Sequence, residues 1–245
     1  METITSTSNR HVKEIAALKE KKNRYSSRLF VAEGINIIKD LGDIKPVEVF
    51  SADEELARKY GATYVSAEVM KKLSDTVTPQ GLLAVFSMPD TDVIPPEGNS
   101  LVLDGVQDPG NAGTMIRTAV ATGFRDIYLN DCVDPFCGKA VRSSMGTIFR
   151  TRIHIGSRED TLSALFAGGC NVFYLDMAGS DIFLEPFDGR TALVVGGEAH
   201  GVGSFYRNAA KGVSLPMERG VESLNAAVSA GIGMYRVFYK NKFGG

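Results

Sequence analysis

Apolar residues along this chain alternate between short extended runs and longer stretches with helical spacing, which is typical of an α/β protein. In the first third of the chain, the pattern predicts a helix over residues 8–22, followed by alternating strands and helices. The predicted strands are residues 28–34, 46–51, 63–66 and 81–87, and the predicted helices are residues 35–41, 53–60 and 67–75.

The second half of the chain contains strands that are apolar almost without interruption, and helical stretches lie between them. Such strands indicate a mainly parallel sheet that is covered on both faces. The predicted strands are residues 100–106, 126–130, 151–155, 171–177, 191–197 and 212–217.

Residues 87–100 separate these two regions. Pro89, Pro95, Pro96 and Gly98 lie close together there without a periodic apolar pattern, so the segment reads as a linker. We therefore predict a smaller N-terminal α/β domain (1–90), a linker (91–99) and a larger C-terminal domain with a parallel sheet (100–245).

The composition is that of a globular protein, with 44% hydrophobic and 23% charged residues among 245. No apolar run approaches the ~20 residues that span a bilayer, and the N-terminus lacks the apolar region of a signal peptide. We expect a cytoplasmic protein with no membrane partner. Three scattered cysteines and three distant histidines favour neither a disulfide framework nor a metal site, so no metal is expected.

The net charge of −2 does not indicate a polyanionic partner for the whole chain, so any nucleic-acid site must be a local patch. Residues 1–30 carry seven Lys or Arg against three Glu, a local balance of +4. On charge alone, a solvated helix face is the favoured interpretation of this segment.

Three groups of polar residues follow predicted strands, where ligands bind in open parallel sheets. The first is DPGNAGTMIRTA, which places Asn111 near the start of a helix and Arg117 within it. From the residues alone, the favoured interpretation is that Asn111 caps the helix and Arg117 pairs with a surface carboxylate.

The second group is the glycine-rich turn VVGGEAHGVG. It lacks the GK[ST] of a P-loop and the GxGxxG of a dinucleotide site, which argues against a nicotinamide oxidoreductase. The turn therefore approaches some other ligand closely or is simply tight. Glu198 within it could bind a ligand or cap a helix.

The third group is LPMERGVESLNAAVSAGI, where Ser223 fits a helix N-cap. Gly231 and Gly233 lie inside the predicted helix, at a cost of ~1 kcal/mol each relative to alanine. Close packing against another backbone or subunit would explain them.

In order and spacing, these three motifs closely resemble those of the SpoU, or TrmH-like, family of RNA ribose 2′-O-methyltransferases. The segments ITSTSNRHVKEIAALKEKKNRYSSRLFVAEG and TPQGLLAVF also resemble the family's small RNA-binding domain. The resemblance implies an S-adenosylmethionine-dependent enzyme with a deep trefoil knot of the SPOUT class in its C-terminal domain. It also implies a homodimer that binds RNA across both subunits.

The resemblance further implies roles for individual residues. The catalytic positions would be Asn111, Arg117, Glu198, Ser223 and Asn225, and the cofactor-binding positions Leu175, Gly196, Gly197, Leu215 and Leu224. With the family in view, the basic N-terminal stretch becomes a candidate for phosphate contacts, with Tyr25 or Phe30 contacting a base. Its RNA-binding residues would be Lys19, Lys21, Lys22, Arg24 and Arg28.

This sequence departs from the family's second motif at Gly197, where Asn or another residue is usual, and at Ala199, where Gly is common. A requirement for positive φ at Ala199 would weaken cofactor binding. The N-terminal domain favours ribosomal RNA of the 23S type as the substrate. A tRNA methyltransferase and a non-catalytic RNA-binding relative remain the alternatives.

Overall fold

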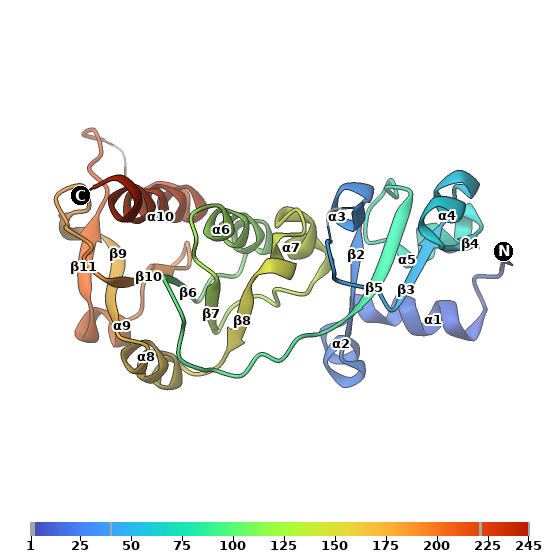
Figure 1. The fold of residues 1–245 in the computed structure, drawn as a ribbon, viewed down its shortest axis with the longest axis horizontal. Coiled ribbons are helices and arrows are strands. Elements are labelled where there is room, and N and C mark those ends of the chain that lie inside the picture. The colour runs from blue at the N-terminus through green and yellow to red at the C-terminus, as the bar shows by residue number, and fades with distance from the viewer. Residues whose placement is uncertain (1–2, 40, 221, 245) are drawn as a thin grey trace. The chain divides into compact units, whose positions relative to one another are not determined.

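The computed structural model describes residues 3–39, 41–220 and 222–244. The chain forms two compact units. The N-terminal unit comprises residues 1–89 and 134–149, and the C-terminal unit comprises residues 90–133 and 150–245 (Figure 1).

The N-terminal unit contains a five-stranded sheet of order β1-β4-β3-β5-β2, in which β5 is antiparallel to both β2 and β3. Its strands are β1 (Thr3–Ile4), β2 (Leu29–Glu33), β3 (Glu48–Ser51), β4 (Thr63–Val65) and β5 (Leu82–Ser87). Its helices up to β5 are α1 (Arg10–Ala16), η1 (Ala17–Lys19), α2 (Lys21–Ser27), α3 (Ile35–Lys39), α4 (Glu54–Tyr60) and α5 (Ala67–Leu73). The predicted helix over 8–22 is therefore wrong in its extent, because the chain forms three short helical segments there.

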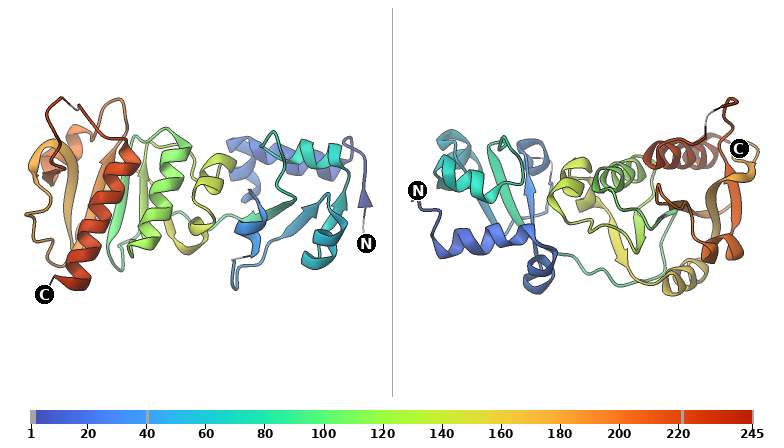
Figure 2. Two further views of the ribbon diagram at one scale, coloured as in Figure 1. Left: turned by 90° about the horizontal axis from the view of Figure 1, so that it is seen from above. Right: turned by 180° about the vertical axis from the view of Figure 1, so that it is seen from behind.

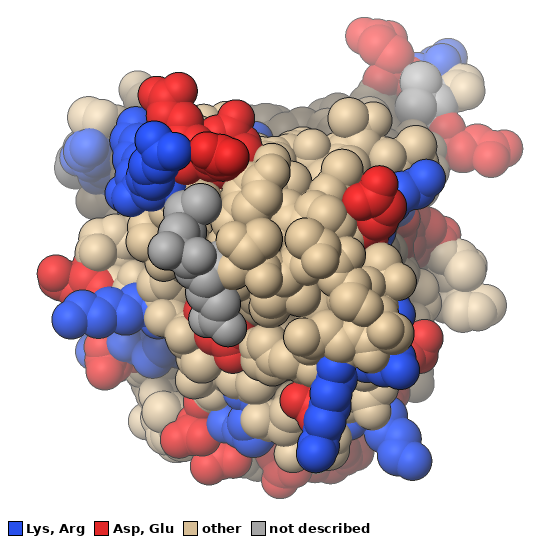
Figure 3. All heavy atoms as spheres, turned by 90° about the vertical axis from the view of Figure 1, so that its right-hand side faces the viewer, with Lys and Arg blue, Asp and Glu red and all other residues tan. Residues whose placement is uncertain are grey.

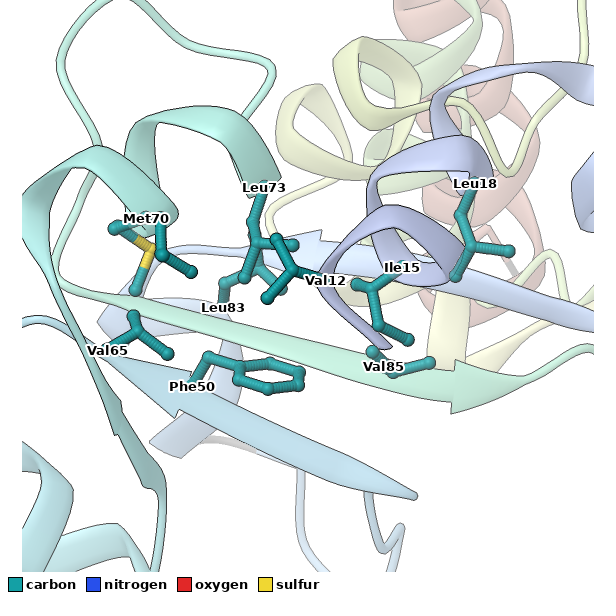
Figure 4. Packing of buried hydrophobic residues seen from close by; sticks show 10 residues of the cluster. Val12, Ile15, Leu18, Phe50, Val65, Met70, Leu73, Leu83 and Val85 are labelled. Carbon is teal, nitrogen blue, oxygen red and sulfur yellow. The ribbon is translucent and has the colours of Figure 1, made fainter. Parts of the chain in front are cut away.

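One face of this sheet packs against α1 and α5. Val12 and Ile15 of α1 and Val69 and Leu73 of α5 are buried against Phe50 and other apolar side chains of the sheet (Figure 4). The apolar spacing of α1 and α5, which predicted helices, places these residues on one side of each helix.

Residues 134–149 complete the other part of the N-terminal core, although they lie far along the chain. This segment contains α7 (Gly138–Ser143) and η2 (Thr147–Arg150), neither of which the apolar pattern singles out. Phe30 of β2 has its ring centroid 5.1 Å from that of Phe136 and 5.7 Å from that of Phe149. The N-terminal unit is therefore built from two separate stretches of sequence.

The proline-rich linker forms no helix or strand in residues 88–99, yet it is held against the C-terminal unit. The backbone N–H of Ile155 donates to the carbonyl of Thr91 (2.9 Å), and the Tyr128 hydroxyl donates to that of Ile94 (2.7 Å). Arg152 pairs with Glu97 at 2.8 Å. Proline content thus predicted the absence of regular structure, but not these anchoring contacts.

The C-terminal unit contains a six-stranded, fully parallel sheet of order β11-β9-β10-β6-β7-β8, which confirms the predicted parallel sheet. Its strands are β6 (Ser100–Asp104), β7 (Asp126–Asn130), β8 (Arg152–Ile155), β9 (Cys170–Asp181), β10 (Arg190–Gly196) and β11 (Lys211–Ser214). The strand order reverses between β6 and β10. Ligands bind at such a switch point, beyond the carboxyl ends of the strands.

Helices cover both faces of the parallel sheet. The helices α6 (Pro109–Ala121) and α10 (Ala226–Phe243) lie side by side on one face, and α8 (Arg158–Ala167) and α9 (Ser204–Ala209) lie on the other (Figures 1 and 2). At Gly233 of α10, a Cβ atom would lie 2.8 Å from Leu193 of β10. The nearest atoms there belong to side chains of the C-terminal unit, and a Cβ atom at Gly231 would make only an ordinary contact with Thr118 at 3.7 Å. The close approach to another backbone that the sequence suggested for these glycines is therefore not found within the described chain.

Candidate active site

Three loops of the C-terminal unit meet beyond the carboxyl ends of β6, β10 and β11. The first opens α6, the second runs from Gly196 to Gly203, and the third leads into α10. Because β6 and β10 are neighbours in the sheet, the first two motifs are brought together by strand pairing. Val221, within the third motif, lies outside the described residues.

A chain of hydrogen bonds connects one side chain from each loop. The side-chain amide of Asn111 donates to Glu198 Oε1, and the side-chain amide of Asn225 donates to Asn111 Oδ1 at 3.2 Å. We call these three residues the amide–carboxylate cluster. The proximity of residues so far apart in sequence is what the family resemblance implied for them.

The helix caps differ from those that the sequence allowed. Asp108 caps α6 by accepting from the backbone N–H of Asn111 at 2.8 Å, so Asn111 lies inside the first turn of the helix. Asn225 caps α10, because its Oδ1 accepts from the backbone N–H groups of Ala227 (2.9 Å) and Val228 (3.2 Å). The cap roles considered for Asn111 and Ser223 are therefore wrong.

A pocket of about 570 Å³ opens beside this cluster. Its volume is within the range of about 300–1,000 Å³ that is usual for small-molecule and cofactor sites. All five predicted cofactor-binding residues line it, together with Glu198, Ser223 and Asn225. These five are Leu175, Gly196, Gly197, Leu215 and Leu224.

Two glycines in the pocket wall are required by close backbone approaches. A Cβ atom at Gly196 would lie 2.0 Å from the carbonyl carbon of Gly201, and one at Gly197 would lie 2.3 Å from the carbonyl oxygen of Gly105. The departure from the family at Gly197 therefore fits this backbone. The positive φ of the loop falls on Gly201 (+62°), and Ala199 is not among the described residues with positive φ. The loop therefore does not require positive φ at Ala199, and the weakening of cofactor binding considered for that case does not arise.

Arg117 lies apart from the amide–carboxylate cluster in its own chain. Its side chain is exposed on α6 and lines neither the pocket nor the groove described below. Within the described part of the chain, no hydrogen bond or ion pair of Arg117 is found. Its separation from Asn111 by six positions places the two side chains on different sides of the helix.

The family resemblance pointed to Leu175 and its neighbours as pocket residues, but nothing in the sequence indicated that Asp176 beside it forms an ion pair with Arg207 at 2.6 Å. Asp176 lies where β9 leaves its ladder with β11, since Tyr174 pairs with Gly212 but the next pair is Ser180 with Val213. The irregularity turns residues 175–177 towards the pocket. No periodicity in the sequence marks it.

A buried polar network supports the same end of the sheet. Asp104, at the end of β6, accepts from Arg158 Nε (2.7 Å) and from the backbone N–H of Gly203 (2.8 Å). Desolvation of Arg158 opposes its charge, but its hydrogen bond to Asp131 and its proximity to Asp104 raise its pKa above the usual value. These contacts fix the start of α9 relative to β6 and thereby the far wall of the pocket.

The described residues contain no group of three or more His, Cys, Asp or Glu side chains arranged to hold a metal ion. Among them, no helix is both long and apolar enough to cross a membrane.

The five predicted RNA-binding residues of the N-terminal unit are placed differently from one another. Lys21, Lys22 and Arg28 are exposed, and Lys19 is partly engaged by the carbonyl of Ser74 at 2.6 Å. Arg24 is only 4% exposed. The basic residues seen in Figure 3 are interspersed with acidic ones around an uncharged centre, so that face of the N-terminal unit is not a continuous basic surface.

Burial excludes two of the predicted RNA contacts. Arg24 pairs with Asp134 at 2.5 Å and donates to the carbonyls of Leu18 and Lys19, so the prediction that it binds phosphate is wrong. Phe30 is 2% exposed within the aromatic core, so it cannot stack on a base. A count of charges does not distinguish a buried arginine from a surface one, and only the distant Asp134 reveals the difference.

Comparison with known proteins identifies the class to which this fold and pocket belong. Residues 98–235 match the SpoU rRNA Methylase family, and the chain belongs to that family. Residues 9–84 match the MRM3-like substrate binding domain.

Individual relatives match over nearly the whole chain. This chain is 31% identical to the 23S rRNA (guanosine(2553)-2′-O)-methyltransferase RlmP of Bacillus subtilis, over 97% of this chain and 99% of that protein. The crystal structure of the AdoMet-bound rRNA methyltransferase from Sinorhizobium meliloti aligns with a TM-score of 0.87 at 30% identity, over 99% of this chain and 98% of that one. The structure of the SpoU methyltransferase AviRb from Streptomyces viridochromogenes, at 23% identity and a TM-score of 0.84, covers 95% of this chain and 98% of its own and supports the fold.

Proposed function

We propose that this protein transfers a methyl group from S-adenosylmethionine to a ribose 2′-hydroxyl of ribosomal RNA of the 23S type. The observation that carries the proposal is the amide–carboxylate cluster beside a pocket of cofactor size, which Glu198 and Asn225 also line. Membership of the SpoU rRNA Methylase family and similarity to RlmP support the choice of ribosomal RNA.

The pocket suits S-adenosylmethionine. Leu175, Leu215 and Leu224 offer apolar contacts for an adenine ring, and Gly196 and Gly197 expose backbone to a ligand without intervening side chains. When bound, the cofactor supplies an already activated methyl group, so the protein must chiefly position the two reactants. The polar residues Glu198, Ser223 and Asn225 line the same pocket and would orient the ribose at its mouth.

A ribose hydroxyl is a poor nucleophile until its proton leaves. The guanidinium of Arg117 is not a realistic base, since arginine does not lose its proton in proteins. We propose that it stays cationic, holds a phosphate next to the target ribose and stabilises the developing alkoxide. An Arg117→Lys variant should therefore lose rate across the pH profile. A rate near that of the wild type would show that the planar guanidinium is unimportant.

The proposed enzyme is a homodimer. A groove of about 1,040 Å³ runs along α10 and is lined by the half-exposed side chains of Phe183, Val228 and Tyr235 and by the more exposed Tyr239. An apolar surface of this kind marks a protein–protein contact. Asn111 and Asn225 also line the groove, so a second copy bound there would lie beside the cluster. In such a dimer, Arg117 of one protomer would serve the pocket of the other.

Mixed dimers test this arrangement. Co-expression of Arg117→Ala and Asn225→Ala chains gives heterodimers with one intact site only if Arg117 acts across the interface. Activity should therefore rise well above that of either variant alone when the two chains are combined. If the mixture is no more active than the separate variants although heterodimers form, Arg117 does not act across the interface.

We propose that Lys21, Lys22 and Arg28 contact RNA phosphates outside the pocket. Lys19 would contribute less, because it already donates to the carbonyl of Ser74. Each phosphate contact that is lost should reduce the dependence of log K on log salt by about 1. Charge reversal at Lys21 and Lys22 should therefore flatten the salt dependence of RNA binding. An unchanged slope would leave these residues as a solvated helix face.

The proposal includes two further features. A deep trefoil knot in the C-terminal unit is supported by membership of the SpoU rRNA Methylase family, and an experimental chain trace through residues 190–225 would test it. The second feature is a cytoplasmic location, which similarity to the bacterial RlmP supports.

Comparison of 2′-O-methyl sites in RNA from cells with and without the gene tests the function. One site in the large-subunit ribosomal RNA should disappear with the gene. Loss of a tRNA site instead would favour the alternative substrate, and no lost site together with no cofactor binding would favour a non-catalytic relative.

A further inference from the structure

The Asp176–Arg207 ion pair lies in the wall of the pocket. Arg207 Nη2 is 2.6 Å from Asp176 Oδ2, and Arg207 Nε donates to the carbonyl of Val202 at 2.8 Å. The guanidinium also lies beside Gly201, where a Cβ atom would be 3.6 Å from Nη2. The arginine is thereby held between the strand irregularity of β9 and the glycine-rich loop.

The charges of the pocket lining are few. Among its described lining residues, Arg207 is the only Lys or Arg, and the acidic residues are Asp176 and Glu198. Glu198 already accepts from Asn111, while His200 is exposed. An anionic group that enters this pocket therefore finds one permanent cation, and a cationic group finds Asp176 beside it.

The ion pair keeps capacity for a ligand. A guanidinium has five N–H donors, and the two described contacts of Arg207 use Nε and Nη2, which leaves Nη1 available. Asp176 accepts from Arg207 at Oδ2 and from the backbone N–H of Ala178 at Oδ1 (2.9 Å), yet a carboxylate has about four lone-pair sites. A ligand with both charges could bind without breaking the pair.

We propose that Arg207 and Asp176 recognise the amino-acid end of the cofactor, with the ligand carboxylate on Arg207 and its ammonium group near Asp176. This inference rests on the proposed function. The two residues would thus select S-adenosylmethionine over adenosine derivatives that lack the zwitterion, because an arginine–carboxylate contact is charge-assisted and directional. If the ion pair served only to join residues 175–179 to the glycine-rich loop, its removal would weaken the binding of every adenosine ligand alike.

Two ligands separate these roles. S-Adenosylhomocysteine carries the amino-acid end, and 5′-methylthioadenosine does not, although both contain the adenosine thioether. Isothermal titration of both ligands should be carried out with the wild type, Arg207→Met and Asp176→Asn. Lys211→Met is the matched control, because Lys211 also carries one positive charge but pairs with Glu185 and does not line the pocket.

Arg207→Met should weaken S-adenosylhomocysteine binding by about 10- to 100-fold, the expected effect of a charged hydrogen bond, with little change for 5′-methylthioadenosine. Asp176→Asn should show the same selectivity with a smaller loss, and Lys211→Met should bind both ligands like the wild type. Retained binding of 5′-methylthioadenosine also shows that the variant pocket is folded.

Equal losses for both ligands, or no loss for either, would overturn the inference and leave the proposed function intact. If the wild type binds neither ligand, the proposed function fails, and this inference fails with it.

Discussion

Asn225 has two separable roles in this structure, because one end of its side chain caps α10 and the other contacts Asn111. Its Oδ1 accepts from two backbone N–H groups, and its Nδ2 donates to Asn111 Oδ1. Asn225→Asp keeps the capping oxygen, since Asp and Asn are about equal as N-caps. It also replaces the donor that faces Asn111 by an acceptor. Asn225→Ala removes both functions.

The expected magnitudes follow from these contacts. Asn225→Ala should lower the free energy of unfolding by about 1 kcal/mol, typical of a lost N-cap. For a chain of this size, that corresponds to a fall in Tm of roughly 2–4 °C. Asn225→Asp should leave Tm nearly unchanged. Loss of this exposed hydrogen bond to Asn111 costs about 0.5–1.5 kcal/mol of orientation at the site, equivalent to a rate lower by roughly 2- to 13-fold.

Tm by calorimetry and single-turnover methyl transfer under saturating cofactor measure the two effects independently. Asn225→Asp should therefore be stable and slow. If Asn225→Asp transfers methyl groups at the wild-type rate, the amide–carboxylate cluster does not orient the reaction. If it unfolds as readily as Asn225→Ala, the separation of the two roles is wrong.

Three further predictions concern stability and the pocket wall. Arg24→Met should cost about 3–5 kcal/mol in urea unfolding because it leaves Asp134 buried without its partner, and a second change, Asp134→Leu, should recover much of that loss; a cost below 1 kcal/mol for Arg24→Met would contradict the buried pair. Gly197→Ala should cost about 1–3 kcal/mol through its clash with backbone, whereas Ala199→Gly should leave cofactor affinity unchanged, as titration calorimetry and thermal unfolding can check. Burial alone would raise the pKa of Asp126, but hydrogen bonds from Arg152 and His154 outweigh it and hold the pKa at about 2. Because this folded pKa lies below the usual 3.9, the stabilisation is present above about pH 4 and is lost as the pH falls towards 2; acid unfolding curves of Asp126→Asn should lack that component, and an unchanged curve would refute it.

The parallel sheet could be predicted because its strands β6, β7 and β10 each carry a nearly continuous apolar run. The strands at 100–106, 126–130 and 191–197 each coincide with a described strand of the C-terminal unit. The convergence of Asn111, Glu198 and Asn225 was reached through family motifs, since no local pattern says which strands are neighbours.

The features that could not be predicted depend on contacts between distant residues. In the sequence, nothing distinguishes Arg24 from the other cations of the basic segment. Its partner Asp134 lies 110 positions away, and only the structure shows the contact. In the same way, Asp176 enters the pocket only because β9 leaves its ladder after Tyr174. Short helices such as α7 and α9, at six residues each, are too brief to show a periodic apolar face.

The central claim is that the pocket and the amide–carboxylate cluster act together on a ribose hydroxyl. The most direct measurement incubates the purified protein with methyl-labelled S-adenosylmethionine and unmodified 23S ribosomal RNA, then digests the RNA to nucleosides. We predict that the label is recovered in a single 2′-O-methylnucleoside. Label on a base, or no transfer to RNA by protein that binds the cofactor, would contradict the claim.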